Sequence, residues 1–221
     1  MIAVIQCAAT KRAHAGYLTT QDGKRVLFVA DPDKAAPIDG FHYARPDDLS
    51  DTGESWRAVL VRYNQTRNDN LLGLHQAYEL YENQIYRRLA HQLGSDKTYI
   101  LSAGWGLINA CFLTPNYDIT FSPNAEPYKR RKKSDFYRDL CLLPENTEER
   151  IVFFGGKDYI PLFCALTQST AGSRTIFFNS KHRPEAPGCL LEAFPTTTRT
   201  NWHYECAQAF LSGKLAMLPW E

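Results

Sequence analysis

The sequence predicts an α/β protein with a mostly parallel central sheet, helices on its faces, and a site at the carboxyl ends of the strands. Short apolar runs of the kind that form buried strands alternate with segments of helical period, which is typical of parallel sheets. Three of the apolar runs pass directly into Gly-rich or polar turns, where ligands of such sheets bind. With 221 residues, 44% of them hydrophobic, the chain fits a single domain over residues 1–221.

In the first half of the chain, apolar runs at 2–6 and 25–30 predict two strands. Residues 31–56 are rich in Pro, Asp and Gly, which predicts a loop insertion rather than regular structure. Leucines at helical spacing then predict a helix over residues 71–93 that ends at Gly94.

The second half continues the alternation. The run at 98–102 predicts a strand that enters a Gly-containing turn and then a helix. Further strands are expected at 150–154 and 174–178, and helices at 160–166 and 201–215.

Composition excludes several classes of site. A net charge of +1 means that any contact with nucleic acid must come from a local patch. The six cysteines contain no CxxC pair, so neither a zinc knuckle nor a thioredoxin-like site is expected; we expect reduced thiols, no metal and no organic cofactor. The chain offers neither a signal peptide nor a bilayer-spanning stretch, which predicts a cytoplasmic protein without a membrane partner.

Two motifs carry candidate chemistry, one directly after a predicted strand and one after Pro115 in a region without strong periodicity. In the turn Ser102–Gly106, two glycines permit close backbone approach and Trp105 between them could stack on a ring, although an ordinary turn with a buried Trp explains the same pattern. In Asn116-Tyr117-Asp118, an amide, a phenol and a carboxylate lie side by side, which suits a base edge or general-base work; Asp is also a common turn residue.

Lys129–Lys133 is the sharpest charge feature, with five consecutive cations beside aromatic residues. This composition suits a phosphate backbone with neighbouring bases, and a solvated basic helix face is the alternative. The turn Gly155–Tyr159 lacks Walker spacing, which excludes an ATPase, but its backbone can face a phosphate. Arg199 and Trp202 are further candidate ligands, whereas His203 is expected to be structural.

These motifs together resemble a known family. Ile100-Leu-Ser-Ala-Gly-Trp-Gly-Leu-Ile108 followed by Asn116-Tyr-Asp-Ile-Thr-Phe121 is similar to the pattern Ser-Ala-Lys-x-Gly-Leu-Leu … Pro-Tyr-Asp-x-Thr-Leu of a bacterial and phage family related to the peroxide-stress protein YaaA. Ile5–Lys11 resembles the family's opening turn, and Phe154–Tyr159 its later Gly-x-x-Tyr turn. Gly104 departs from the family's Lys, whose role would fall to Lys11 or Lys157, and Asn116 departs from its Pro.

The resemblance implies work on DNA, including the antiphage removal of glucosylated hydroxymethylcytosine by a DNA glycosylase. We therefore expect a glycosylase that excises a modified base from DNA, with Asp118 as catalytic carboxylate and Asp158 and Glu205 in reserve. The alternatives are a non-catalytic YaaA-like DNA-binding stress protein and a nucleotide- or base-modifying transferase.

The residues expected to contact the substrate are Cys7, Lys11, Ser102, Gly104, Trp105, Asn116, Tyr117, Gly155, Gly156, Lys157 and Tyr159. Those expected to contact nucleic acid are Lys129, Arg130, Arg131, Lys132, Lys133, Arg199 and Trp202.

Overall fold

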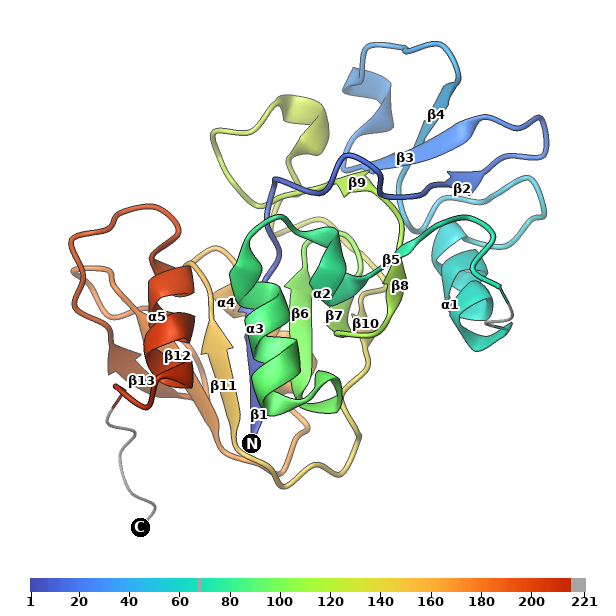
Figure 1. Cartoon of the computed structure of the whole chain (residues 1–221). Helices are drawn as coiled ribbons and strands as arrows, with labels where there is room; N and C mark the ends of the chain where they lie inside the picture. Colours follow the sequence, from blue (N-terminus) through green and yellow to red (C-terminus); the bar gives the residue numbers. More distant parts are fainter. Residues whose placement is uncertain (67–68, 216–221) are drawn as a thin grey trace.

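A seven-stranded sheet forms the centre of the protein in the computed structural model, which describes residues 1–66 and 69–215 (Figure 1). Five neighbouring strands are parallel, β7 is antiparallel to β6, and β10 pairs with β7. The mostly parallel α/β fold is therefore confirmed. The strand order across the sheet is β10 (Leu140–Cys141), β7 (Gly106–Asn109), β6 (Thr98–Ser102), β1 (Ile2–Gln6), β11 (Ile151–Phe154), β12 (Arg174–Phe178) and β13 (Leu190–Ala193).

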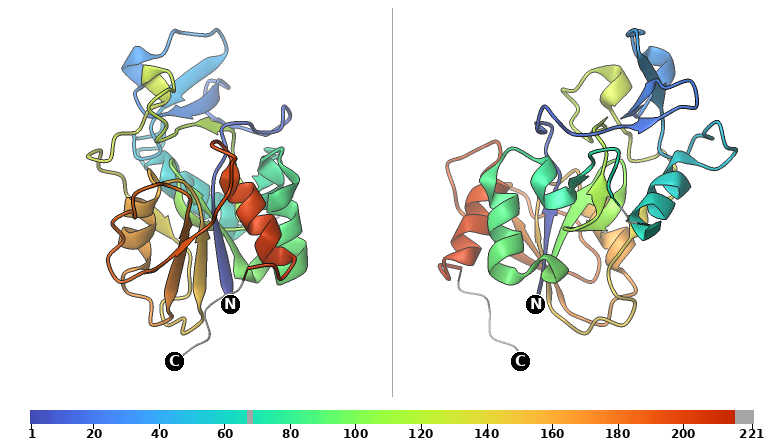
Figure 2. Two further views of the ribbon diagram at one scale, coloured as in Figure 1. Left: turned by 90° about the vertical axis from the view of Figure 1, so that its left-hand side faces the viewer. Right: turned by 45° about the vertical axis from the view of Figure 1, so that its right-hand side comes forward.

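The middle strands are buried along their whole length because helices cover both faces of the sheet. All five residues of β6 and all four of β11 are buried, as expected for parallel strands enclosed on two sides. Helices α3 (Gln84–Leu93) and α5 (Trp202–Leu211) lie on one face, and α4 (Ile160–Thr167) lies on the other (Figure 2). The expected closing helix is thus present and ends before residue 215.

A smaller sheet lies beyond the carboxyl edge of the central one, at the top of Figure 1. It contains β2 (Leu18–Thr19), β3 (Arg25–Val29), β4 (Phe41–Ala44) and β9 (Tyr117–Asp118). The predicted strand at 25–30 is therefore a strand of this second sheet. The expectation of a loop over 31–56 is wrong at β4, because pairing with β3 supplies the hydrogen bonds that its local sequence does not demand; the short helix η1 (Pro32–Lys34) precedes it.

The predicted helix over 71–93 is shorter and interrupted. Its first two residues are in a turn, with Leu71 88% exposed, and the strand β5 (His75–Gln76) then pairs with β8 (Leu113–Thr114). Helix α2 (Ala77–Leu80) follows, and α3 begins after Asn83, whose side chain accepts a hydrogen bond from the Ile85 N–H at 2.9 Å. Apolar spacing alone did not reveal this Asn cap inside the pattern.

The remaining helices are α1 (Trp56–Thr66), η2 (Ser95–Lys97) and η3 (Pro127–Lys129). Within the described parts of the chain, none of the helices has both the length and the apolar character needed to cross a bilayer.

The turn after β6 leads into a strand, not into the expected helix. Ser102 pairs with Gly106, so Ala103–Trp105 form a three-residue hairpin loop between β6 and β7. Gly106 has φ +91°, and a Cβ there would lie 2.4 Å from the Leu140 carbonyl oxygen. A glycine is therefore required, and the chain reverses direction instead of starting a helix.

Candidate functional site

A cavity of about 410 Å³ opens at the carboxyl edge of the central sheet. Four chain segments form its walls: the loop after β1, the segment after β9, the loop after β11 and the segment that enters α5. Its lining residues are Gln6, Cys7, Ala8, Ala9, Thr10, Ile119, Thr120, Ser122, Pro123, Gly156, Asp158, Tyr159, Arg199, Thr200, Asn201, Trp202, His203 and Tyr204.

The turns after β1 and β11 meet at this cavity, so two of the three predicted turns converge. The Gly156 N–H donates to the Gln6 Oε1 at 2.6 Å, and the Cys7 Sγ lies 3.3 Å from the Tyr159 hydroxyl. Burial raises the pKa of Tyr159 far above its ordinary value, which keeps its hydroxyl protonated. Gly155 lies beneath the wall, where a Cβ would meet the Phe153 ring at 2.2 Å. It is therefore needed for packing and does not line the cavity.

The α5 wall is polar and strained at its start. Asn201, the residue before α5, has φ +60° and makes no side-chain cap, so the first N–H groups of the helix are not satisfied by it. His203 is 3% exposed, and its Nε2 has no hydrogen-bond partner among the described residues. Burial lowers the pKa of His203 to about 4, so its imidazole is neutral near pH 7. His203, for which a structural role is expected, therefore also lines the cavity wall.

A second cavity, of about 380 Å³, lies on the other side of residues Ala9–Lys11, against the smaller sheet. Lys11, Asn116, Tyr117 and Asp118 line it. The Lys11 Nζ lies 4.2 Å from the centre of the Tyr117 ring, and burial lowers the pKa of Lys11. The Asn116 side chain donates to the Tyr17 hydroxyl at 3.0 Å.

Asp118 is held by an ion pair in this second cavity. Its Oδ2 lies 2.8 Å from the Lys129 Nζ, which also contacts Glu126 at 2.7 Å. Burial alone would lower the pKa of Lys129, but its hydrogen bonds with the two carboxylates raise it. The predicted carboxylate therefore lines a different cavity from Cys7, Gly156 and Tyr159, whereas Asp158, the reserve, lines the same one.

The other reserve carboxylate, Glu205, accepts hydrogen bonds from Thr196 and Thr198, which lower its pKa. It lines neither of the two cavities.

The hairpin turn is buried and lines neither of the two cavities, unlike the prediction that Ser102, Gly104 and Trp105 face a substrate. All three are buried, and the Trp105 side chain is 0% exposed because it packs against Phe28 with ring centres 4.9 Å apart. The Ser102 hydroxyl donates to the Tyr117 hydroxyl at 2.9 Å and accepts from the backbone N–H groups of its own turn.

The motif residues thus serve packing. A Cβ on Gly104 would lie 3.3 Å from the Tyr117 ring, so the glycine lets this ring approach the turn. Tyr117 is itself 1% exposed, and its hydroxyl also shares a hydrogen bond of 2.7 Å with Tyr81. The ring of Tyr117 forms part of the second cavity wall, but its hydroxyl points into the core.

The basic run Lys129–Lys133 does not form one cationic face, which corrects the prediction of a continuous nucleic-acid surface. Arg131 is 5% exposed and makes a bidentate ion pair with Asp139, at 2.9 and 2.6 Å. Arg130 donates to the Ala125 carbonyl at 2.7 Å. Lys132 and Lys133 are exposed, and the Lys133 Nζ lies 3.4 Å from Asp158 at the first cavity.

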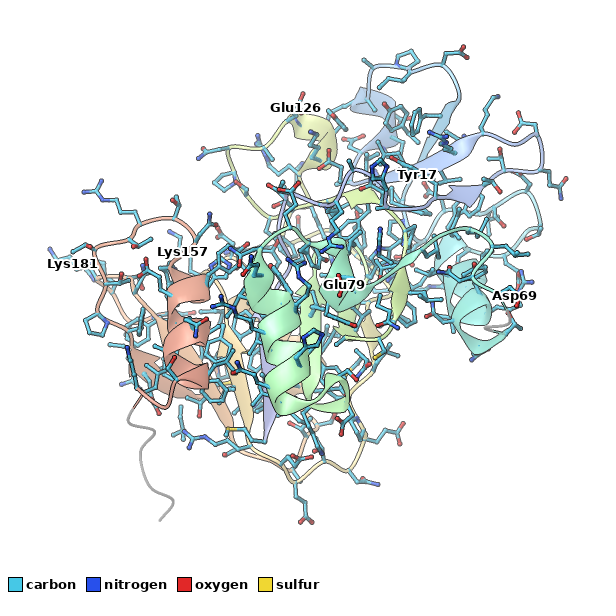
Figure 3. The ribbon with its side chains drawn as sticks, viewed as in Figure 1. Tyr17, Asp69, Glu79, Glu126, Lys157 and Lys181 are labelled. Carbon is cyan, nitrogen blue, oxygen red and sulfur yellow. The ribbon has the colours of Figure 1, made fainter. Side chains whose placement is uncertain are left out.

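Arg199 and Trp202, two further residues predicted to contact nucleic acid, both line the first cavity but differ in their exposure. Arg199 is exposed at the rim, whereas Trp202 is 6% exposed and stacks on Phe194 with ring centres 6.3 Å apart. Lys157 is exposed at the upper edge of the central sheet, where Figure 3 labels it, but it does not line the cavity.

Gln6 is a wall residue that lies within the Ile5–Lys11 motif but is not among the residues expected to contact the substrate. The available signal was a polar side chain at the end of an otherwise apolar strand. In the described residues, no group of three or more His, Cys, Asp or Glu side chains could hold a metal ion.

No family model, curated protein or solved structure matches this chain. Its function must therefore be inferred from the geometry of the two cavities.

Proposed function

We propose that the protein is a DNA glycosylase that excises a modified base, such as glucosylated hydroxymethylcytosine, in antiphage defence. The observation that carries the proposal is the first cavity, whose 410 Å³ lies within the range of about 300–1,000 Å³ typical of small-ligand sites. It combines aromatic, amide and carboxylate side chains, which are the groups that an extruded nucleoside requires. The resemblance to the YaaA-related family also supports a DNA substrate.

The cavity offers both a stacking surface and polar groups for a base. Tyr159 and Tyr204 supply rings, and Gln6, Asn201 and His203 supply groups that hydrogen-bond. An extruded base loses its stacking and pairing energy, a cost of a few kcal/mol that contacts of this type offset. Because His203 is neutral and its Nε2 is unpartnered among the described residues, a bound base would satisfy a polar atom that is otherwise buried without a partner.

Asp158 is the carboxylate that we assign to catalysis. Its side chain is 32% exposed, and it lies beside Tyr159 on the cavity wall. As the bond between the sugar and the base breaks, the base leaves with the bonding electrons and the anomeric carbon becomes positively charged. Asp158 would stabilise that charge and accept a proton from the attacking water, while the protonated Tyr159 hydroxyl would donate a hydrogen bond to the leaving base.

Exposed cations near the cavity support binding of the DNA backbone. Lys133 is placed by its contact with Asp158, and Arg199 lies on the α5 side of the rim. These two cations come from segments far apart in the sequence. They replace the continuous basic run as the proposed phosphate contacts.

The test is base release from DNA duplexes containing cytosine, hydroxymethylcytosine or glucosylated hydroxymethylcytosine, followed by alkaline cleavage at abasic sites. We expect strand breaks in a modified duplex only, and Asp158→Asn should reduce the single-turnover rate about 100-fold or more. Asp118→Asn is the matched control, because it changes a carboxylate in the other cavity, and it should retain most of the activity.

Intact DNA from every duplex would refute the glycosylase. Salt-sensitive DNA binding without base release would instead favour the non-catalytic DNA-binding alternative. Base release that depends on Asp118 and not on Asp158 would move the reaction to the second cavity.

A further inference from the structure

Two cysteines outside the proposed site lie next to each other. Cys164 is in α4, and Cys189 lies just before β13, 25 residues later in the sequence. Their Sγ atoms are 3.8 Å apart, and both residues are partly exposed to solvent. All six cysteines are free thiols in this structure. Among the described residues, this is the one thiol–thiol contact within hydrogen-bond distance.

Arg174 on β12 holds the two segments together. Its guanidinium donates to the Gly188 carbonyl at 3.1 Å, beside Cys189, and reaches the Cys164 carbonyl at 3.5 Å. The hydrogen bond between the two thiols and the positive charge of Arg174 lower the pKa of Cys189, despite its burial. The same hydrogen bond raises the pKa of Cys164. Of the two thiols, Cys189 is therefore the one that more readily forms a thiolate.

We propose that Cys164 and Cys189 form a reversible intramolecular disulfide when the protein meets a hydroperoxide. The Cys189 thiolate attacks one peroxide oxygen, the O–O bond breaks, and the departing oxygen takes up a proton. Cys189 is then a sulfenic acid. The Cys164 sulfur attacks it, the S–S bond forms, and water leaves with the Cys164 proton. In total, two thiols and one hydrogen peroxide give a disulfide and two waters, and two equivalents of a thiol reductant reverse the reaction.

The local structure allows the small movement that this bond requires. The Sγ atoms must approach from 3.8 Å to about 2.0 Å. Gly188, next to Cys189, has φ +67° in an exposed turn, so the backbone there is free of the restraints of a strand or helix. By contrast, Cys7 and Cys206 are buried, and burial raises the pKa of Cys141. Cys111 is partly exposed, but among the described residues no second thiol lies within hydrogen-bond distance of it, so disulfide formation is directed to the Cys164–Cys189 pair.

The bond would join segments that lead to both main walls of the first cavity. Helix α4 follows the loop Gly155–Tyr159 directly, and the chain passes from β13 to residues 199–204 at the start of α5. The proposal does not depend on what the cavity binds. The disulfide is tested by the mass of the protein and the glycosylase by base release, so either proposal can fail without the other.

The experiment treats the reduced full-length chain with one to a few equivalents of hydrogen peroxide and measures its intact mass. We expect a loss of two hydrogen atoms that dithiothreitol reverses, and a non-reduced tryptic map in which the Cys164 and Cys189 peptides are linked. The midpoint of thermal unfolding should rise by about 5–12 °C, because the crosslink restricts the unfolded chain.

Two substitutions separate the steps. Cys164→Ser should leave a sulfenic acid on Cys189, which dimedone converts to a stable adduct. Cys189→Ser should form neither the dimedone adduct nor the disulfide. Cys141→Ser is the matched control and should form the disulfide normally. Linkage of other cysteines, intermolecular dimers alone, or oxidation of Cys189 to sulfinic acid without a disulfide would overturn the proposal.

Discussion

Arg131→Ala should strongly destabilise the protein, although Arg131 lies within the run that looks like a DNA-binding surface. Arg131 and Asp139 have side chains that are 5% and 8% exposed, and the guanidinium also donates to the Ala103 carbonyl at 2.7 Å. It covers the Tyr137 ring at 3.8 Å from the ring centre. Removing it leaves a buried carboxylate without its partner, which costs about 3–5 kcal/mol in free energy of unfolding. For a chain of this size, that loss lowers the melting temperature by about 6–20 °C.

Urea unfolding followed by the fluorescence of the four tryptophans measures this loss. Lys132→Ala is the matched control, because its exposed side chain should change the free energy of unfolding by no more than about 0.5 kcal/mol. The double substitution Arg131→Met with Asp139→Leu should be less destabilising than Arg131→Ala, since it leaves no unpaired buried charge. A loss below about 1 kcal/mol in Arg131→Ala would refute the reasoning, and Arg131 would then be available to DNA.

Three further substitutions test the packing and the ionisation described above. Gly106→Ala should lower the free energy of unfolding by about 2 kcal/mol or more in a urea titration, because its φ of +91° and the 2.4 Å approach to the Leu140 oxygen both oppose a side chain; an unchanged midpoint would contradict this. Tyr117→Phe should cost about 1–2 kcal/mol in the same titration, since the buried Ser102 hydroxyl loses its acceptor, and an equal or greater stability would show that the hydroxyl network is dispensable. Burial lowers the pKa of His203 to about 4, below the value near 6.5 in the unfolded chain, so the free energy of unfolding is unaffected by this histidine above pH 6.5 and falls by about 3 kcal/mol as the pH drops to 4. His203→Gln should remove that part of the pH dependence of unfolding. Identical pH profiles of the free energy of unfolding in the two proteins would contradict this prediction.

The central strands could be predicted from the sequence because strands buried on both faces contain consecutive apolar residues. The runs at 2–6, 98–102 and 174–178 each contain three or four consecutive apolar residues, as expected of strands covered on both faces, and each run is a strand of the central sheet. The convergence of the turns at Cys7 and Gly155–Tyr159 followed from the same pattern, since parallel strands end at one edge.

The turn Ser102–Gly106 does not reach the first cavity, because its conformation depends on strand pairing with residues far along the chain. Whether Ser102–Gly106 starts a helix or a hairpin depends on β7 pairing with both β6 and β10, and β10 lies more than 30 residues further along the chain. The same limit applies to β4, whose strand conformation comes from pairing with β3. Local propensity carries no information about such partners.

The sequence by itself determined the α/β class, the buried strands and the Cys7 and Gly155–Tyr159 turns, because these depend on the order of apolar and polar residues along the chain. Only the tertiary structure decided which charges are paired and which cavity each carboxylate lines. Asp118 pairs with Lys129 and lines the second cavity, whereas Asp158 pairs with Lys133 and lines the first cavity. Arg131 pairs with Asp139 away from both cavities. The physical reason is that burial and ion pairing depend on distances between side chains, and the fold sets these distances.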